Sequence, residues 1–197
     1  MNTLEKVETE VRPQFQKNVA YIQEYLYGRG ADIGCGSCPL LRPLCDIYGD
    51  QSEQPIALEA IKQSLKRKDE LNIERARPKF IISDGLHCLN GEDLFDFIFS
   101  SHMLEDLPTV DDMILYLNVW SISLAKEGRI VLLMPDIEGG RYPKAGEPGS
   151  NPSHQIDIGP KLFQEKILPE LTCLKLIQID TIPHISETFD VVLQRRN

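Results

Sequence analysis

A glycine-rich turn contains the first residues whose types and spacing could bind a ligand. It is the run Asp-Ile-Gly-Cys-Gly-Ser-Cys at residues 32–38. Gly34 and Gly36 have no Cβ atom, so a ligand could lie directly against the backbone there. A helix that begins just after the turn would add backbone N–H groups for binding. The turn therefore predicts a ligand site, although a tight structural turn would use the same glycines.

Two histidines and one aspartate could take part in proton transfer. His102 and His154 could each accept a proton at neutral pH, because an unperturbed imidazole has a pKa of ~6.5. Asp136 follows a strongly apolar run and could orient an acceptor or bind a metal. Each residue also has a simpler interpretation: His102 as an interior histidine bonded to backbone, His154 as a loop residue, and Asp136 as a cap.

Cys35 and Cys38 have the spacing of a redox or zinc-binding pair. A zinc site would need a second pair of ligands, which the sequence lacks, so we expect no metal site here. The chain has five cysteines in all, a number that is odd and too small for a disulfide framework. We therefore expect reduced thiols and a cytoplasmic protein.

Apolar runs separated by turn residues predict the strands and helices that position these groups. Strands are expected at residues 31–33, 56–58, 79–84, 95–101, 129–134, 173–180 and 189–194. Helices are expected over an N-terminal stripe that ends at Gly28, from Pro39, over 63–77, from the N-cap Thr109 toward Gly128, and over 161–168. The strand at 56–58 has an alternative, in which residues 56–65 are all helix. Residues 135–160 contain five Pro and five Gly and are expected to form a long functional loop.

The alternation of strands and helices predicts an α/β fold with a doubly wound, mostly parallel sheet. The last two strands must pair antiparallel, because residues 181–187 are too few for a crossover helix. Ligands of such sheets bind at the carboxyl ends of the strands, where the glycine turn would lie. Pro39 occupies the position of the third glycine of a dinucleotide fingerprint, and a parallel sixth strand is missing, so nicotinamide or flavin binding is disfavoured.

Several motifs follow these expected strands in an order typical of one family. Ser83-Asp84-Gly85 comes after the third strand, and Ser-His-Met-Leu-Glu-Asp-Leu at residues 101–107 comes after the fourth. With the glycine turn and the closing hairpin, the chain resembles a class I S-adenosylmethionine-dependent methyltransferase with a Rossmann-like, seven-strand sheet. The resemblance covers residues 28–197, and residues 1–27 would form a helix packed on that domain.

The resemblance implies a binding site for S-adenosylmethionine. The glycine turn would meet the methionine part, and an acidic residue at the end of the second strand would bind both ribose hydroxyls. Glu59 matches that acid, with Asp46 and Asp50 as fallbacks if the strand lies elsewhere. Asp84 would accept from the adenine amino group. The implied cofactor-binding residues are Asp32, Gly34, Cys35, Gly36, Glu59, Asp84, Gly85, Leu86 and Ser101.

The stretch after the fourth strand also resembles the branch that methylates small molecules and sugars. This resemblance implies a small-molecule or glycan-precursor acceptor, with His102, His154 and Asp136 as catalytic candidates. Methyl transfer needs a base only if the acceptor is a weakly acidic hydroxyl or an ammonium group. The alternative is a non-catalytic member of the fold that binds a nucleotide or a protein, suggested by Cys38 in place of the third glycine and by the short first strand.

Composition disfavours two classes of partner. The 197 residues include 21 Lys and Arg against 30 Asp and Glu, for a net charge of −9. Such a surface repels phosphate backbones and anionic lipids, so we expect neither a nucleic-acid nor a membrane partner. No apolar stretch approaches the roughly 20 residues of a membrane span. The oligomeric state stays open.

Overall fold

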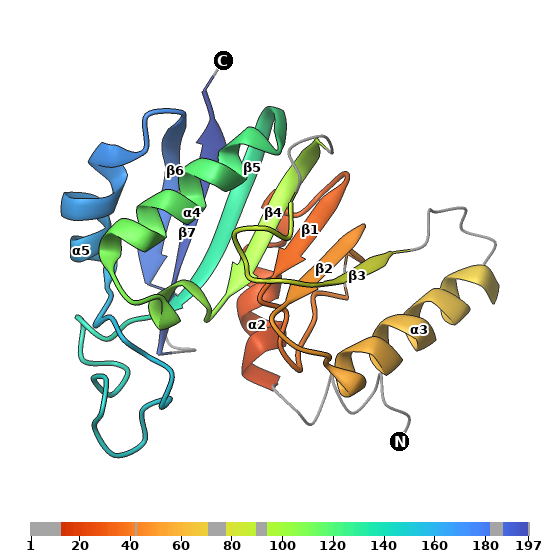
Figure 1. The fold of residues 1–197 in the computed structure, drawn as a ribbon, viewed down its shortest axis with the longest axis horizontal. Helices are drawn as coiled ribbons and strands as arrows, with labels where there is room; N and C mark the ends of the chain where they lie inside the picture. The colour runs from red at the N-terminus through yellow and green to blue at the C-terminus, as the bar shows by residue number, and fades with distance from the viewer. Residues whose placement is uncertain (1–12, 42, 71–77, 90–93, 182–186, 197) are drawn as a thin grey trace.

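The fold is a seven-stranded sheet between two layers of helices. A computed structural model describes residues 13–41, 43–70, 78–89, 94–181 and 187–196. The strand order is β3-β2-β1-β4-β5-β7-β6, as Figure 1 shows. The strands are β1 Gly30–Ile33, β2 Ile47–Asp50, β3 Lys79–Ile82, β4 Phe95–Ser101, β5 Leu124–Pro135, β6 Leu174–Thr181 and β7 Thr188–Arg195.

The first five strands are parallel, and β7 runs antiparallel to both β5 and β6. The predicted doubly wound sheet with an antiparallel C-terminal hairpin is therefore confirmed. Because the parallel strands all end at the same edge, the residues that follow β1, β2, β3 and β4 gather there.

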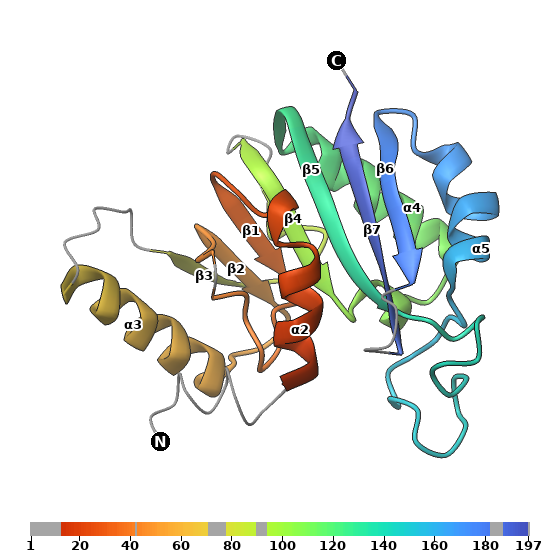
Figure 2. The ribbon, with the colours of Figure 1, turned by 180° about the vertical axis from the view of Figure 1, so that it is seen from behind.

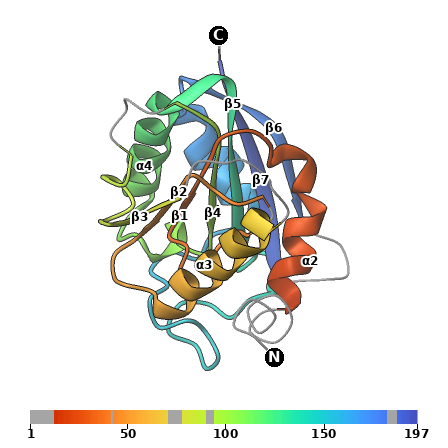
Figure 3. The ribbon, with the colours of Figure 1, turned by 90° about the vertical axis from the view of Figure 1, so that its right-hand side faces the viewer.

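Helices cover both faces of the sheet. One face carries α4 (Val110–Ile122) and the helical segment α5 (Pro160–Leu162), η4 (Phe163–Ile167) and η5 (Leu168–Glu170). The other carries α2 (Pro13–Tyr21), η2 (Gln23–Tyr25) and α3 (Pro55–Glu70). Figure 2 shows α2 in front of the sheet, and Figure 3 shows α4 and α2 on opposite sides of the strands. No helix in the described ranges is long and apolar enough to cross a membrane.

The start of α4 is as predicted. Thr109 has extended backbone angles and its hydroxyl accepts a 3.1 Å hydrogen bond from the Asp112 amide, which is an N-cap contact. Met113, Leu117 and Trp120 are all fully buried on the sheet side. The helix ends earlier than expected, at Ile122, because Leu124 already pairs with Phe95 as part of β5.

The predicted strand at residues 56–58 is wrong. Those residues lie in α3, where Ala57, Ala60 and Ile61 are buried against the sheet. The second strand is instead β2, which contains Gly49. A Cβ atom at Gly49 would lie 2.4 Å from the Cys88 sulfur, so only glycine fits this position. Glycine has low strand propensity, and it therefore weakens the sequence pattern of β2.

The predicted helix after the glycine turn is also wrong. The described residues among 37–46 form turns and one isolated bridge between Leu41 and Leu44, with no helix. Buried side chains satisfy this backbone instead. The Tyr48 hydroxyl donates to the Leu40 carbonyl at 2.6 Å and accepts from the Cys45 amide at 2.9 Å.

The long loop between β5 and α5 begins at the sheet edge where the parallel strands end, directly after β5. Its described residues, 136–159, form no helix or strand. The amides of Gln155 and Ile156 donate to the Glu105 carbonyl at 2.9 and 3.2 Å. These two bonds bring the second half of the loop against the segment that follows β4.

Candidate active site

A cavity of about 310 Å³ lies at the carboxyl ends of the parallel strands. It is lined by Gly34, Asp50, Gln51, Gly85, His102, Met103, Asp106, Leu107 and Ser153. A smaller cavity of about 70 Å³ shares Gly34 and His102 with it. Its other lining residues are Phe15, Asp32, Cys35, Ser37, Cys38, Phe99 and Ser101. The two cavities thus bring together six of the twelve predicted site residues: Asp32, Gly34, Cys35, Gly85, Ser101 and His102.

The glycine turn is tied to the neighbouring strand. Gly34 has φ +73°, and a Cβ atom there would lie 2.6 Å from the Met103 side chain. Its amide donates to the Gly49 carbonyl at 2.8 Å, and the Gly36 amide donates to Oδ2 of Asp50 at 2.8 Å. The turn needs glycine for its backbone angles and for its close packing.

Asp32 is a buried carboxylate beside the smaller cavity. Its Oδ2 accepts a 2.7 Å hydrogen bond from the Leu40 amide, whereas Oδ1 has no partner among the described residues. Burial raises the pKa of Asp32 to about 7, even though the Leu40 bond lowers it. Asp32 therefore changes charge near neutral pH and would be stabilised as an anion by a cationic group.

Asp50 takes the place that the sequence assigned to Glu59. Asp50 ends β2 and lines the larger cavity. Glu59 is exposed on α3, and its carboxylate accepts from the Gln63 side chain at 3.0 Å. The error follows directly from the misplaced second strand, and the fallback residue Asp50 is the acid at the strand end.

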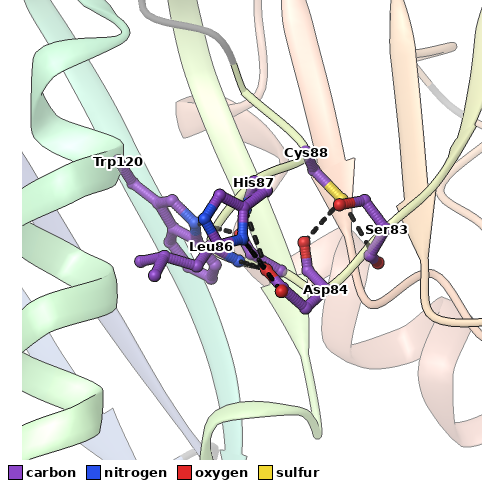
Figure 4. A network of polar contacts seen from close by, with 7 residues as sticks. Ser83, Asp84, Leu86, His87, Cys88 and Trp120 are labelled. Carbon is purple, nitrogen blue, oxygen red and sulfur yellow. Dashed lines mark hydrogen bonds and ion pairs between the residues drawn. The ribbon is translucent and has the colours of Figure 1, made fainter.

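The Asp84 carboxylate makes its hydrogen bonds within the turn that follows β3, as Figure 4 shows. The Asp84 carboxylate accepts from the amides of Leu86 and His87 at 3.0 and 2.9 Å and contacts the His87 imidazole at 2.8 Å. The Trp120 indole donates to the Gly85 carbonyl at 2.8 Å. Gly85 lines the larger cavity, whereas Asp84 and Leu86 are not among its lining residues.

His102 borders both cavities and has an unusual backbone. Its φ is +51°, in the left-handed region that costs a residue with a side chain about 1–2 kcal/mol. Its amide donates to the Leu133 carbonyl at 2.9 Å, which fixes the residue just past β4. Strained backbone of this kind is common where a side chain must be held in a functional position.

Glu105 joins the two predicted histidines. Oε1 of Glu105 lies 3.3 Å from Nδ1 of His102 and 3.4 Å from Nε2 of His154. The Glu105 side chain is fully buried, and the His154 side chain is 1% exposed. Burial acts to raise the pKa of Glu105, but the two imidazoles outweigh it and the pKa is lowered. Burial likewise acts to lower the pKa of His154, but Glu105 raises it overall.

Sequence reasoning did not identify Glu105 as a site residue. Its position in the motif after β4 was a usable signal, because that motif ends at the ligand edge of the sheet. Nothing in the sequence indicates that Glu105 contacts His154, because this contact depends on the path of a long loop.

Asp136 lies outside both cavities. Its side chain is buried, and Oδ1 accepts from the Gly139 amide at 2.9 Å. The Arg141 side chain lies 3.5 Å from Oδ2. In the structure Asp136 caps the start of the long loop.

Comparisons with known proteins find structural neighbours only. No protein-family model matches the chain, and no curated protein is found as a relative by sequence. The N-methyltransferase NodS from Bradyrhizobium japonicum WM9 superposes with a TM-score of 0.64 at 14% identity, over 95% of this chain and 99% of that chain. NodS in complex with S-adenosyl-L-homocysteine gives a TM-score of 0.60 at 16% identity, with 100% of both chains covered.

A further neighbour is magnesium protoporphyrin IX methyltransferase (ChlM) from Synechocystis PCC 6803 with bound S-adenosylmethionine. It has a TM-score of 0.56 and 17% identity, over 96% of this chain and 84% of that chain. At these identities the likeness concerns the fold. The chain has the fold of class I S-adenosylmethionine-dependent methyltransferases.

Proposed function

We propose that the protein is an S-adenosylmethionine-dependent methyltransferase that acts on a small hydroxylated acceptor, such as a sugar or glycan precursor. The observation that carries the proposal is the larger cavity. Gly34, Asp50 and Gly85 line it at the strand ends, the edge at which such sheets bind ligands. His102 and Asp106 line the same cavity, which supports room for a second ligand.

The residues present fit the cofactor. The unpartnered Oδ1 of Asp32, beside the smaller cavity, suits the ammonium group of the methionine part. Asp50 offers the carboxylate that can accept from both ribose hydroxyls. A bound S-adenosylmethionine would supply an electrophilic methyl group on a sulfonium.

The chain itself would bind and align the reactants and exclude water. An in-line displacement depends mainly on this alignment. Gly34 and Gly85 allow Met103 to pack closely in the cavity lining, because a Cβ atom at either position would lie within 3.0 Å of Met103. His102 is the best-placed side chain to meet an acceptor, since it borders both cavities. The polar lining residues Gln51, Asp106 and Ser153 support a hydroxylated acceptor rather than an apolar one.

One observation favours the non-catalytic alternative. The Gly36 amide donates a hydrogen bond to the Asp50 carboxylate. These two groups would both be needed to bind a cofactor, but here they bind each other. In that case the cavity would bind a nucleotide or a protein segment without transferring a methyl group.

Calorimetry with S-adenosylhomocysteine tests the proposal, with NAD as the control ligand. We expect one site for S-adenosylhomocysteine and no response to NAD. A panel of nucleotide sugars and hydroxylated small molecules, incubated with methyl-labelled cofactor, should then give a labelled product. Absence of binding at millimolar ligand would overturn the proposal, and binding without any labelled product across the panel would favour the non-catalytic alternative.

A further inference from the structure

The cluster of His102, Glu105 and His154 joins two distant parts of the chain. His102 lies two residues before η3 (Leu104–Asp106), Glu105 lies within it, and His154 comes from the long loop. One side-chain atom from each residue lies within 4.8 Å of the other two. Such a set of two imidazoles and one carboxylate is a common set of metal ligands.

Hydrogen bonding alone leaves this cluster poorly satisfied. The two N···O distances of 3.3 and 3.4 Å exceed the roughly 2.7–2.9 Å of charge-assisted hydrogen bonds. Within the described residues, neither carboxylate oxygen of Glu105 has a hydrogen-bond partner, and Nδ1 of His154 and Oδ1 of Asp106 also have none. A fully buried carboxylate in this condition needs a cation beside it, either a protonated imidazole of the cluster or a bound metal ion.

The same distances fit the edge of a metal tetrahedron. Zinc bonds to imidazole nitrogen and carboxylate oxygen are about 2.0–2.2 Å long, so two tetrahedral ligand atoms lie about 3.3–3.5 Å apart. The distances from Oε1 of Glu105 to Nδ1 of His102 and to Nε2 of His154 are 3.3 and 3.4 Å. Nε2 of His102 points toward the Thr188 hydroxyl at 3.4 Å, a position in which a second residue can orient a metal-bound imidazole.

We propose that His102, Glu105 and His154 bind a divalent transition metal, with Zn²⁺ as the best match, and that its remaining coordination position opens to the larger cavity. His102 and Asp106 line that cavity, so a ligand in it can reach the metal. Three protein ligands with one open position are typical of catalytic rather than structural zinc. Oδ1 of Asp106, 3.9 Å from Nε2 of His154, is near enough to bind the same ion or a hydroxyl group on it.

A role for the metal in methyl transfer rests on the proposed function. A bound divalent ion lowers the pKa of a coordinated hydroxyl group, as it does for water in catalytic zinc sites. The acceptor would lose its hydroxyl proton to solvent water. Its oxygen would then form the new O–C bond while the C–S bond of the sulfonium breaks, and S-adenosylhomocysteine leaves. The preferred acceptor would therefore carry a hydroxyl group able to coordinate the metal.

Metal binding can be tested without any acceptor. Protein treated with a chelator should take up one Zn²⁺ per chain in calorimetry, and Co²⁺ should give the visible absorption bands of a tetrahedral site. Glu105→Gln and His154→Gln should weaken Zn²⁺ binding by about 100-fold or more. His87→Gln is the matched control, because His87 also contacts a carboxylate, that of Asp84, but is exposed and outside the cluster.

Two results would overturn the metal proposal. One is wild-type protein that takes up no Zn²⁺ or Co²⁺ at stoichiometric concentrations, and the other is equal affinity in the wild type and His154→Gln. If the buried variants fail to fold, His102→Gln gives the same test, because the His102 side chain is 26% exposed. Binding of S-adenosylhomocysteine, measured on the same samples, separates this proposal from the proposed function: either ligand can bind when the other does not.

Discussion

Oδ2 of Asp50 accepts a 2.8 Å hydrogen bond from the Gly36 amide, which joins the end of β2 to the glycine turn after β1. Oδ1 of the same carboxylate accepts from the Ser52 amide at 3.3 Å and from the Gln54 side chain at 3.2 Å. Asp50 is therefore held in one position at the border of the larger cavity. A carboxylate fixed in this way loses little conformational freedom when it binds a ligand.

Asp50→Asn should weaken S-adenosylhomocysteine binding by about 1.5–3 kcal/mol, the range for losing charge-assisted hydrogen bonds. The side chain keeps its shape, so the turn should stay folded. Glu59→Gln is the matched control, since it removes the same charge from the exposed face of α3 and should leave binding within about 0.5 kcal/mol of the wild type. Calorimetry measures both, and equal losses in the two variants would contradict the assignment.

The raised pKa of Asp32 predicts that cofactor binding depends on pH. Burial holds this pKa at about 7, so Asp32 is mostly neutral at about pH 6 and mostly anionic at about pH 7.5. If the anion binds the ammonium group of the ligand, affinity for S-adenosylhomocysteine should rise roughly tenfold over this interval. Asp32→Asn should bind more weakly at the upper pH, and its affinity should hardly change with pH. An Asp32→Asn profile as steep as that of the wild type would assign the titration to another group.

Asp190 predicts a separate effect on stability. It is fully buried in β7, and burial raises its pKa to about 6 although the Gln178 side chain donates to it at 2.7 Å. An acid with a raised pKa holds its proton more tightly in the folded state than in the unfolded state. Its contribution to stability is thus present below about pH 4 and is lost as the pH rises through about 6.

Asp190→Asn removes this titration. The melting temperature of Asp190→Asn minus that of the wild type should increase as the pH rises from about 5 to about 8. Thermal unfolding of both proteins across this range provides the measurement. A difference in melting temperature that does not change with pH would mean that Asp190 does not titrate as the structure implies.

The fold was predictable from sequence where strands are long and apolar. β4 has the predicted bounds, 95–101, because Phe95, Phe97, Ile98 and Phe99 make a dense apolar and aromatic pattern that favours a strand. β2 was missed because Gly49 weakens its pattern and because its pairing with β1 and β3 is not local. The missing helix after the glycine turn had a similar cause, since the side chain of Tyr48 replaces helical hydrogen bonds in a way that no periodicity reveals.

The candidate site was predictable where residues directly follow a strand. Gly34 and His102 were placed at the ligand edge by their positions after β1 and β4, and both line the cavities. The contact between Glu105 and His154 was not predictable, because the hydrogen bonds from Gln155 and Ile156 to the Glu105 backbone determine the path of the loop. Such bonds join backbone atoms only, so the residue types do not reveal them.

The backbone and the side chain of His102 can be tested separately. Its φ of +51° suits glycine, so His102→Gly should be more stable than His102→Ala by about 1 kcal/mol. Both variants lack the imidazole that borders both cavities and that we propose faces the acceptor, so both should lower kcat by about 100-fold or more. Affinity for S-adenosylhomocysteine should change little in either. Denaturant unfolding and turnover with a labelled methyl donor measure the two effects. Equal stability of the two variants would remove the argument from backbone strain, whereas full activity in His102→Gly would show that the imidazole takes no part in methyl transfer.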